Sequence, residues 1–178
     1  MSTPPTTLVE VMLSHAETGD SEHALHCWNP AIRAYSSVTY SELSKRAFAF
    51  GKQLQNQGAH AGRVIMIACH SPYATLVAFY GTVSIGAIPM IFPMPLSLGS
   101  HEALVERIRH WGLGFKKPAM LVLEEGPNEK FHELIPPEVS TIRLSESVEG
   151  DWDTLDTPAA DFRPNPDDVA FFQTTSSS

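Results

Sequence analysis

DDVAFFQTTSSS, residues 167–178, is the segment from which the architecture of this chain can be inferred. It contains a short apolar run, Val169 to Phe172, and then five consecutive hydroxyl residues. An apolar run of this length between polar segments predicts a buried strand. Small hydroxyl residues directly after a strand suit a loop whose backbone N–H and side-chain O–H groups surround phosphate oxygens. The alternative for such a row is a solvated terminal tail.

Upstream of this segment, apolar runs alternate with stretches of helical periodicity. Strands are predicted at 64–68, 87–92, 119–123 and 139–144, and helices at 71–86, 100–114 and 128–135. The first strand is apolar throughout, which is typical of a parallel strand covered on both faces. Pro89, Pro93 and Pro95 make the far end of the second strand irregular, so it is predicted to be an edge strand or a strand that leaves the sheet. Repeated strand–helix units of this kind predict right-handed crossovers around a parallel sheet, so the predicted fold class is α/β.

The N-terminal part of the chain is predicted to form a helix, a hairpin and a second, longer helix. Helical spacing begins at Leu8, and two short strands, 24–28 and 35–38, flank a turn at Asn29-Pro30. Thr39 and Glu42 have the spacing of a capping box at the start of the longer helix, which Gly58 is expected to end.

Composition excludes several functional classes. The chain has 178 residues, 43% of them hydrophobic and 18% charged, which fits a globular domain. The net charge of −8 and the lack of a Lys/Arg cluster argue against nucleic acid or an anionic membrane as partner. There is no apolar run long enough to span a bilayer and no secretory signal pattern. Cys27 and Cys69 have no metal-binding spacing and are expected to be buried free thiols, so a cytoplasmic location is expected.

Residues 167–178 resemble the start of the phosphate-binding loop of adenylate-forming enzymes. This superfamily includes acyl-CoA synthetases, fatty-acyl-AMP ligases and nonribosomal-peptide adenylation domains. In the family a strand leads into a Thr-Ser-Gly-Ser/Thr-Thr-Gly loop and then a Lys. Thr175, Ser176 and Ser178 match this pattern, whereas Ser177 stands where the family usually has Gly. Further segments resemble the family in the same order: VTYSEL (38–43), GRVIMI (62–67), and FYG with SIGAIP (79–89).

The resemblance implies a fold and an activity. The fold would be the N-terminal portion of the layered parallel-sheet domain of the acyl-CoA synthetase type, with residues 1–178 ending inside the phosphate-binding loop. The activity would be ATP-dependent activation of a carboxylic acid as acyl-AMP, followed by transfer to a CoA or acyl-carrier-protein thiol. ATP and Mg²⁺ would be the cofactors. The residues implied to hold the β- and γ-phosphates are Thr174, Thr175, Ser176, Ser177 and Ser178.

The same resemblance implies that the chemistry is incomplete within these residues. In relatives the adenine-binding segment, the acidic Mg²⁺ ligand, the ribose-binding Asp and the catalytic Lys all lie further downstream. No catalytic or metal-binding residue is therefore expected here, and the chain alone is predicted to be inactive. The segment PMIFPMP, residues 89–95, resembles the fatty-acyl-AMP ligase branch, which favours a fatty acid as substrate. The alternatives are an adenylation domain that selects an amino acid and a non-catalytic interaction module.

Other chemically distinctive residues are expected to have ordinary structural roles. His70 follows a strand and is expected to cap or pack, and His101 and His110 are expected at the surface. The acidic pairs Glu124-Glu125 and Asp167-Asp168 are expected to be solvated. Aromatic side chains expected in the core are Trp28, Phe79 and Trp111.

Overall fold

The computed structural model describes residues 7–17, 25–29, 33–94, 101–115, 119–125, 129–144 and 165–173. The elements within these ranges are α1 (Leu8–Glu17), β1 (Leu25–Asn29), β2 (Ala34–Val38), α2 (Tyr40–Asn56), β3 (Val64–Ala68), α3 (Pro72–Ser84), β4 (Ile88–Ile91), α4 (His101–Gly114), β5 (Met120–Glu124), α5 (Glu129–Leu134) and β6 (Ser140–Leu144). The predicted phosphate-binding residues 174–178 lie outside the described residues.

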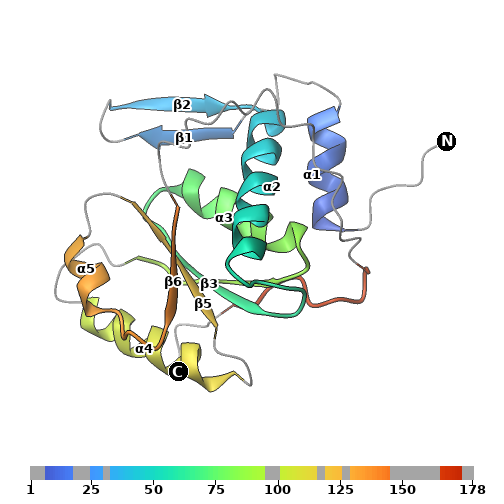
Figure 1. The fold of residues 1–178 in the computed structure, drawn as a ribbon. Helices are drawn as coiled ribbons and strands as arrows, with labels where there is room; N and C mark the ends of the chain where they lie inside the picture. The colour runs from blue at the N-terminus through green and yellow to red at the C-terminus, as the bar shows by residue number, and fades with distance from the viewer. Residues whose placement is uncertain are drawn as a thin grey trace.

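A four-stranded parallel sheet, in the order β4-β3-β5-β6, forms the centre of the structure (Figure 1). In β3, Met66 lies between Met90 of β4 and Leu121 of β5. All five residues of β3 are buried, as its continuous apolar sequence predicted. The α/β class, the parallel pairing and the edge position of the Pro89 strand are therefore confirmed.

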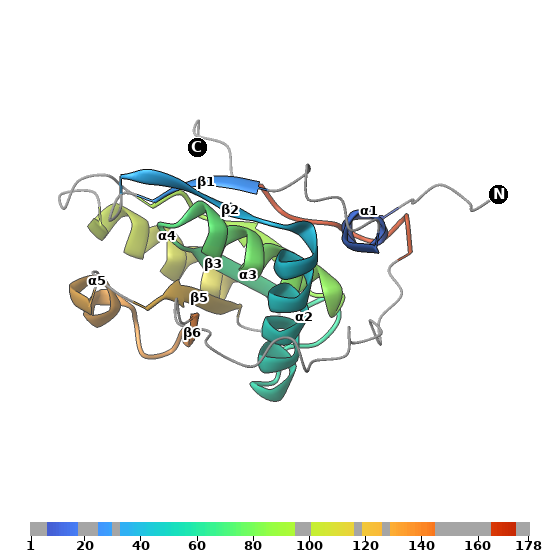
Figure 2. The same cartoon turned by 90° about the horizontal axis from the view of Figure 1, so that it is seen from above.

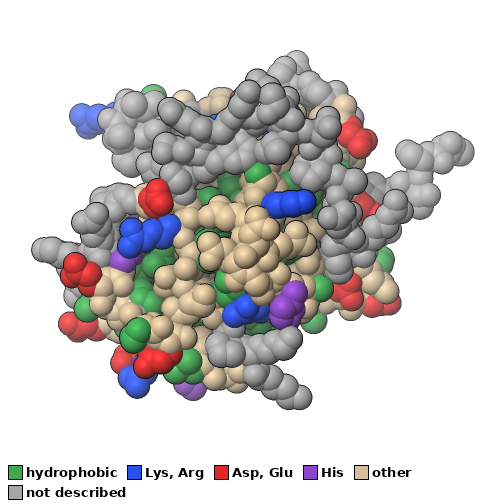
Figure 3. Space-filling view, viewed as in Figure 1, with side chains coloured by type: hydrophobic (Ala, Val, Ile, Leu, Met, Phe, Trp, Pro, Cys, Tyr) green, Lys and Arg blue, Asp and Glu red, His purple; other side chains and the backbone are tan. Residues whose placement is uncertain are grey.

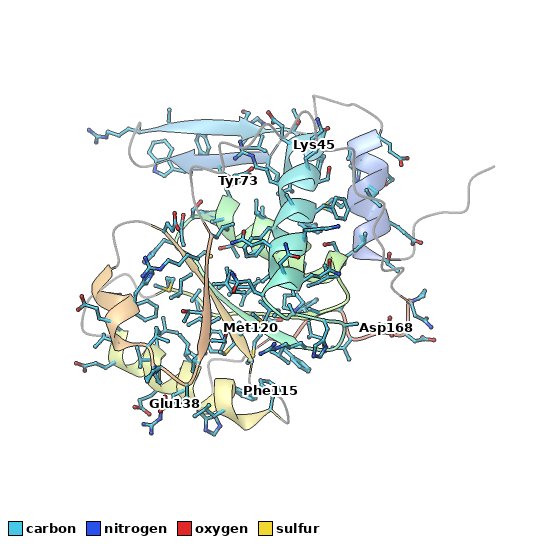
Figure 4. All side chains as sticks on the ribbon, in the orientation of Figure 1. Lys45, Tyr73, Phe115, Met120, Glu138 and Asp168 are labelled. Atoms are coloured by element: carbon cyan, nitrogen blue, oxygen red, sulfur yellow. The ribbon has the colours of Figure 1, made fainter. Side chains whose placement is uncertain are left out.

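The two faces of the sheet carry separate apolar cores because successive side chains of a strand point to opposite faces. Ile65 and Ile67 pack with side chains of α2 and α3, together with Met120 of β5 (labelled in Figure 4). Val64 and Met66 pack on the other face with Ile108 of α4 and Phe131 of α5. Helices therefore cover both faces, as a sheet with fully apolar strands requires (Figure 1).

The helix α1 extends the layer of α2 and α3. Its buried residues Val9 and Met12 form a small cluster with Phe48 of α2 and Val83 of α3. Val11, on another side of the helix, is 38% exposed. Figures 1 and 2 show α1 and α5 at opposite ends of the molecule.

The hairpin of β1 and β2 is antiparallel, as predicted, and packs beside the start of α3, where Tyr73 lies beneath it (Figure 4). Trp28 pairs with Tyr35 across the strands, and the two rings make an edge contact with centroids 5.3 Å apart. Trp28 is nevertheless 50% exposed, so its predicted core position is wrong. A two-stranded ribbon has one face turned away from the core, and the alternation of side chains puts Trp28 there. Cys27 is only half-buried, which also differs from the prediction.

The helix α4 ends at Gly114, as predicted. Gly112 is buried inside its last turn, against Met66 and Val139. A small residue allows α4 to approach the sheet closely at this point. Trp111 lies on the outer side and is 38% exposed, so its predicted core position is also wrong.

Candidate functional site

The carboxyl ends of β3 and β5 lie side by side and bring several polar groups together. β3 ends at Ala68 and is followed by Cys69 and His70, while its neighbour β5 ends at Glu124. Open parallel sheets bind ligands outside the carboxyl ends of their strands. We therefore take this edge of the sheet as the candidate site.

The turn between β3 and α3 is held by side chains from both elements and from β5. Ser71 is the N-cap of α3, and its Oγ accepts a hydrogen bond from the Ala74 N–H at 3.3 Å. Pro72 follows at the first helical position, where its missing N–H costs no helical hydrogen bond. The Glu124 Oε2 atom accepts hydrogen bonds from the backbone N–H groups of His70 and Ser71, each at 2.8 Å. Glu124 was expected to be solvated, and this expectation is wrong.

Burial controls the titration of the groups beside this turn. The pKa of the Cys69 thiol is raised to about 12, first by burial and then by the charge of Glu124. The pKa of His70 is lowered by partial burial and by its proximity to His101. At neutral pH the thiol is therefore protonated and the His70 imidazole is mainly neutral.

The two histidines of α4 have different environments. His110 is exposed, as expected. His101 is only 8% exposed and packs against Phe131, with ring centroids 5.4 Å apart, so its expected surface position is wrong. Its position at the start of α4 turns it toward α5, which the sequence pattern of α4 alone could not indicate.

Residues 165–173 run beside β4, the outer strand on one side of the sheet. The N–H of Phe172 donates to the Pro89 carbonyl oxygen at 2.9 Å, and Phe172 forms a parallel bridge with Met90. The predicted strand is thus reduced to one bridge within the described residues. It is also not buried, because Val169 is 55% exposed and Phe171 is 49% exposed. Because Pro89 has no N–H, it can offer the neighbouring segment only its carbonyl.

Two aromatic contacts hold this segment against the rest of the fold. Phe171 meets Phe79 of α3, with ring centroids 6.0 Å apart. Phe172 stacks with Phe115, which follows α4, at 6.1 Å (Phe115 is labelled in Figure 4). Consecutive side chains thus contact residues that pack on opposite faces of the sheet, as in a strand. The bridge is parallel, so residues 171–173 run toward the carboxyl edge of β4.

Asp167 and Asp168 are both exposed, as expected, and Asp168 closes a local turn at the start of the segment. Its carboxylate Oδ2 accepts a hydrogen bond from the Asn165 N–H at 2.8 Å, and its own N–H donates to the Asn165 carbonyl oxygen at 2.9 Å. Asp168 is labelled in Figure 4. Such a turn fixes the direction in which the chain enters the edge of the sheet.

Two kinds of feature are absent from the described residues, namely metal-binding clusters and membrane-spanning helices. No group of three or more His, Cys, Asp or Glu residues in it could hold a metal ion. Among the helices described, none is both long and apolar enough to cross a bilayer. On the face seen in Figure 3, described Lys and Arg side chains are scattered among acidic ones and form no continuous patch.

A family comparison covers nearly the whole chain. The model of the AMP-binding enzyme family matches residues 14–178. The chain belongs to this family. The match includes the β3–α3 turn, the segment beside β4 and the hydroxyl residues that follow, so the resemblance seen in the sequence is confirmed. No curated protein sequence gives a significant match.

Solved structures of AMP-forming enzymes share the fold. An adenylation domain of a keto acid-selecting NRPS module, bound to keto acyl adenylate, superposes with a TM-score of 0.76 and 18% identity over 98% of this chain and 30% of that chain. A fatty acid AMP ligase from Legionella pneumophila superposes with a TM-score of 0.65 and 15% identity, over 94% of this chain and 27% of that chain. A structure from work on fatty acyl-adenylate ligases of E. coli and L. pneumophila superposes with a TM-score of 0.65 and 21% identity, over 93% of this chain and 29% of that chain. The chain thus spans less than a third of the length of these AMP-binding structures.

Proposed function

We propose that this chain is the N-terminal part of an ATP-dependent ligase that activates a carboxylic acid as acyl-AMP. The observation that carries the proposal is the path of residues 171–173, which run parallel to β4 toward the carboxyl edge of the sheet. In the proposal the hydroxyl residues that follow continue to this edge, where their N–H and O–H donors would bind phosphate. Membership of the AMP-binding family gives independent support.

In this proposal Thr174, Thr175, Ser176, Ser177 and Ser178 hold the β- and γ-phosphates of ATP. Their hydroxyl and N–H groups offset phosphate charge, and Mg²⁺ bound elsewhere in the ligase offsets the remainder. Residues 1–178 would be a partial domain that does not adenylate a substrate by itself, and the ligase would act in the cytoplasm. Ser177 lacks the backbone freedom of glycine. Replacing it, Ser177→Gly, is expected to lower the KM for ATP severalfold.

The class of acid is proposed from the sequence. The proline-rich segment at 89–95 favours a fatty acid, with transfer to an acyl carrier protein or CoA thiol. A second candidate is an NRPS-type adenylation domain that selects an amino or keto acid, because a keto acid-selecting domain gives the TM-score of 0.76. A panel of fatty, aryl, keto and amino acids distinguishes these two. A third candidate, a non-catalytic interaction module, would show no turnover with any of them.

The proposal is tested by carboxylate-dependent exchange of labelled pyrophosphate into ATP. The assay is run on the 178-residue chain and on the longest polypeptide that its gene encodes. We expect exchange by the longer polypeptide and none by the chain alone. In the longer polypeptide, Thr175→Val and Ser176→Ala should each lower kcat/KM for ATP about 10- to 100-fold. This is the effect expected from losing one hydrogen bond to a charged group.

Ser140→Ala is the matched control, because Ser140 is an exposed hydroxyl residue on β6. It should leave kcat/KM for ATP unchanged. Absence of exchange with every acid in the panel would overturn the proposed activity. Loop variants that exchange as rapidly as Ser140→Ala would overturn the assignment of the phosphate-binding residues.

A further inference from the structure

Two helices of this fold begin with the same hydrogen-bond pattern, but they obtain it differently. In α2 the N-cap is Thr39, whose Oγ1 accepts from the Glu42 N–H at 3.2 Å. Glu42 in turn accepts from the Thr39 N–H at 2.9 Å, which completes a capping box within one turn of chain. In α3 the N-cap is Ser71, and the residue in the place of Glu42 is Ala74, which has no carboxylate.

The missing carboxylate comes from the neighbouring strand. The Glu124 Oε2 atom accepts from the N–H of Ser71 at 2.8 Å, the bond that an acidic residue at position 74 would otherwise make. The same oxygen accepts from the N–H of His70, also at 2.8 Å. These donors precede Glu124 by 53 and 54 residues, so they are joined only when β3 and β5 pair.

We propose that Glu124 completes the capping box of α3 from the adjacent strand and thereby positions the His70–Ser71 turn for ligand binding at the carboxyl edge. The first part depends only on the hydrogen bonds above. The second part rests on the proposed function, because it takes this edge as the site of the ligase. The turn follows β3, two strand spacings from the segment of Phe172, or about 10 Å.

The charge of Glu124 is suited to this role. The side chain is half-buried, and its two hydrogen bonds are charge-assisted. It also stands at the N-terminal end of α3, where the helix dipole favours a negative charge. The first turn of α3 contains no acidic residue of its own. Removal of the carboxylate therefore leaves two N–H groups without a partner, and the turn loses the contact that ties it to β5.

The first arm of the test measures the turn itself and needs no ligand. Amide hydrogen exchange at His70 and Ser71 is followed in the 178-residue chain, together with their amide proton shifts. Glu124→Ala should accelerate exchange at both amides about 10- to 100-fold and remove their downfield shifts. Glu124→Gln, whose amide oxygen can accept the same bonds without the charge, should restore part of the protection. Glu125→Gln is the matched control, since Glu125 is adjacent and exposed.

If Glu124→Ala does not fold, Glu124→Gln is compared with Glu125→Gln and should accelerate exchange about 3- to 10-fold because the charge is lost while the shape is kept. Equal exchange at both amides in the Glu124 and Glu125 variants would overturn the capping role.

The second arm measures function in the longest polypeptide that the gene encodes. Glu124→Gln should lower kcat/KM in pyrophosphate exchange about tenfold. Its melting temperature should equal that of Glu125→Gln. Unchanged kinetics together with faster exchange at His70 and Ser71 would overturn the positioning role and leave the proposed function intact. A wild-type polypeptide without activity would instead overturn the proposed function, and the amide measurements would still decide the capping role.

Discussion

Gly51 and Gly81 lie against each other where α2 crosses α3. A Cβ atom built on Gly81 would stand 2.6 Å from the Ala47 carbonyl oxygen and 3.1 Å from the Gly51 nitrogen. A Cβ atom on Gly51 would stand 2.7 Å from the Gly81 carbonyl oxygen. The helices are thus in backbone contact, and the layer on this face of the sheet depends on two residues without side chains.

Gly81→Ala should destabilise the fold by about 2–3 kcal/mol, because backbone atoms cannot move aside as a flexible side chain can. The measurement is the urea midpoint of unfolding. Gly114→Ala is the matched control, since no atom lies within 4 Å of a Cβ built there. It should be neutral or stabilising by up to about 1 kcal/mol. Equal midpoints for the two variants would show that α2 and α3 do not pack as described.

The capping box of α2 leads to a second prediction. Thr39→Ala removes the hydroxyl that accepts from the Glu42 N–H, and should cost about 1 kcal/mol of the free energy of unfolding. Ser41→Ala is the control, because only the backbone carbonyl of Ser41 is used, as acceptor for the Ser44 hydroxyl. Thermal unfolding of both variants measures the difference. A control that melts as low as Thr39→Ala would show that the loss of stability is not specific to the cap.

Local signals predicted most of this fold correctly. The apolar run at Val64–Ala68 is buried on both faces, and Thr39 and Glu42 form the predicted capping box, because both features depend on neighbouring residues alone. The errors concern long-range placement. Trp28 and Trp111 are hydrophobic enough for a core, but which side of a ribbon or helix meets the core is decided by its packing partner.

The candidate site was predictable only in part. The resemblance predicts phosphate binding by the hydroxyl residues after Gln173, which lie outside the described residues, and the helix that starts after Ser71 was predicted from the sequence. The carboxylate of Glu124 was missed because its partners lie more than 50 residues away and are backbone groups, which leave no trace in a sequence pattern. An acidic residue directly after a buried strand is the one signal that could have drawn attention to it.

The two cysteines should differ in reactivity. Cys69 is 8% exposed and its pKa is raised to about 12, so the reactive thiolate is scarce. Cys27 is half-buried in the hairpin. With a disulfide reagent at pH 8, the folded chain should react rapidly at Cys27 alone, and Cys27→Ser should abolish this phase. Rapid labelling of Cys69 in native conditions would contradict the burial of the β3–α3 turn.

The raised pKa of Cys69 also predicts a loss of stability in alkali. Between the ordinary pKa of 9.0 and about 12, the folded state keeps a proton that the unfolded state has lost, so stability falls as pH rises. By pH 10, one unit above the ordinary pKa, the loss from this group should be about 1.4 kcal/mol. The measurement is the difference in unfolding free energy between wild type and Cys69→Ala at pH 7 to 10. Tyr73 and Tyr80, whose pKa values are also raised by burial, cancel in this difference. A difference that does not change with pH would contradict the prediction.

The attachment of residues 165–173 to the sheet should depend on its two aromatic contacts. Phe171 and Phe172 remain 49% and 38% exposed. Each ring therefore contributes only part of the free energy of a fully buried side chain, on the order of 1 kcal/mol. Phe172→Ala should therefore leave the global melting temperature nearly unchanged but increase proteolytic cleavage within this segment, because one backbone hydrogen bond to Pro89 is a weak attachment on its own. Val169→Ala is the matched control, since Val169 is 55% exposed. Cleavage of both variants at the wild-type rate would show that the aromatic rings do not hold the segment, and the path toward the carboxyl edge would then have to be fixed by residues further along the chain.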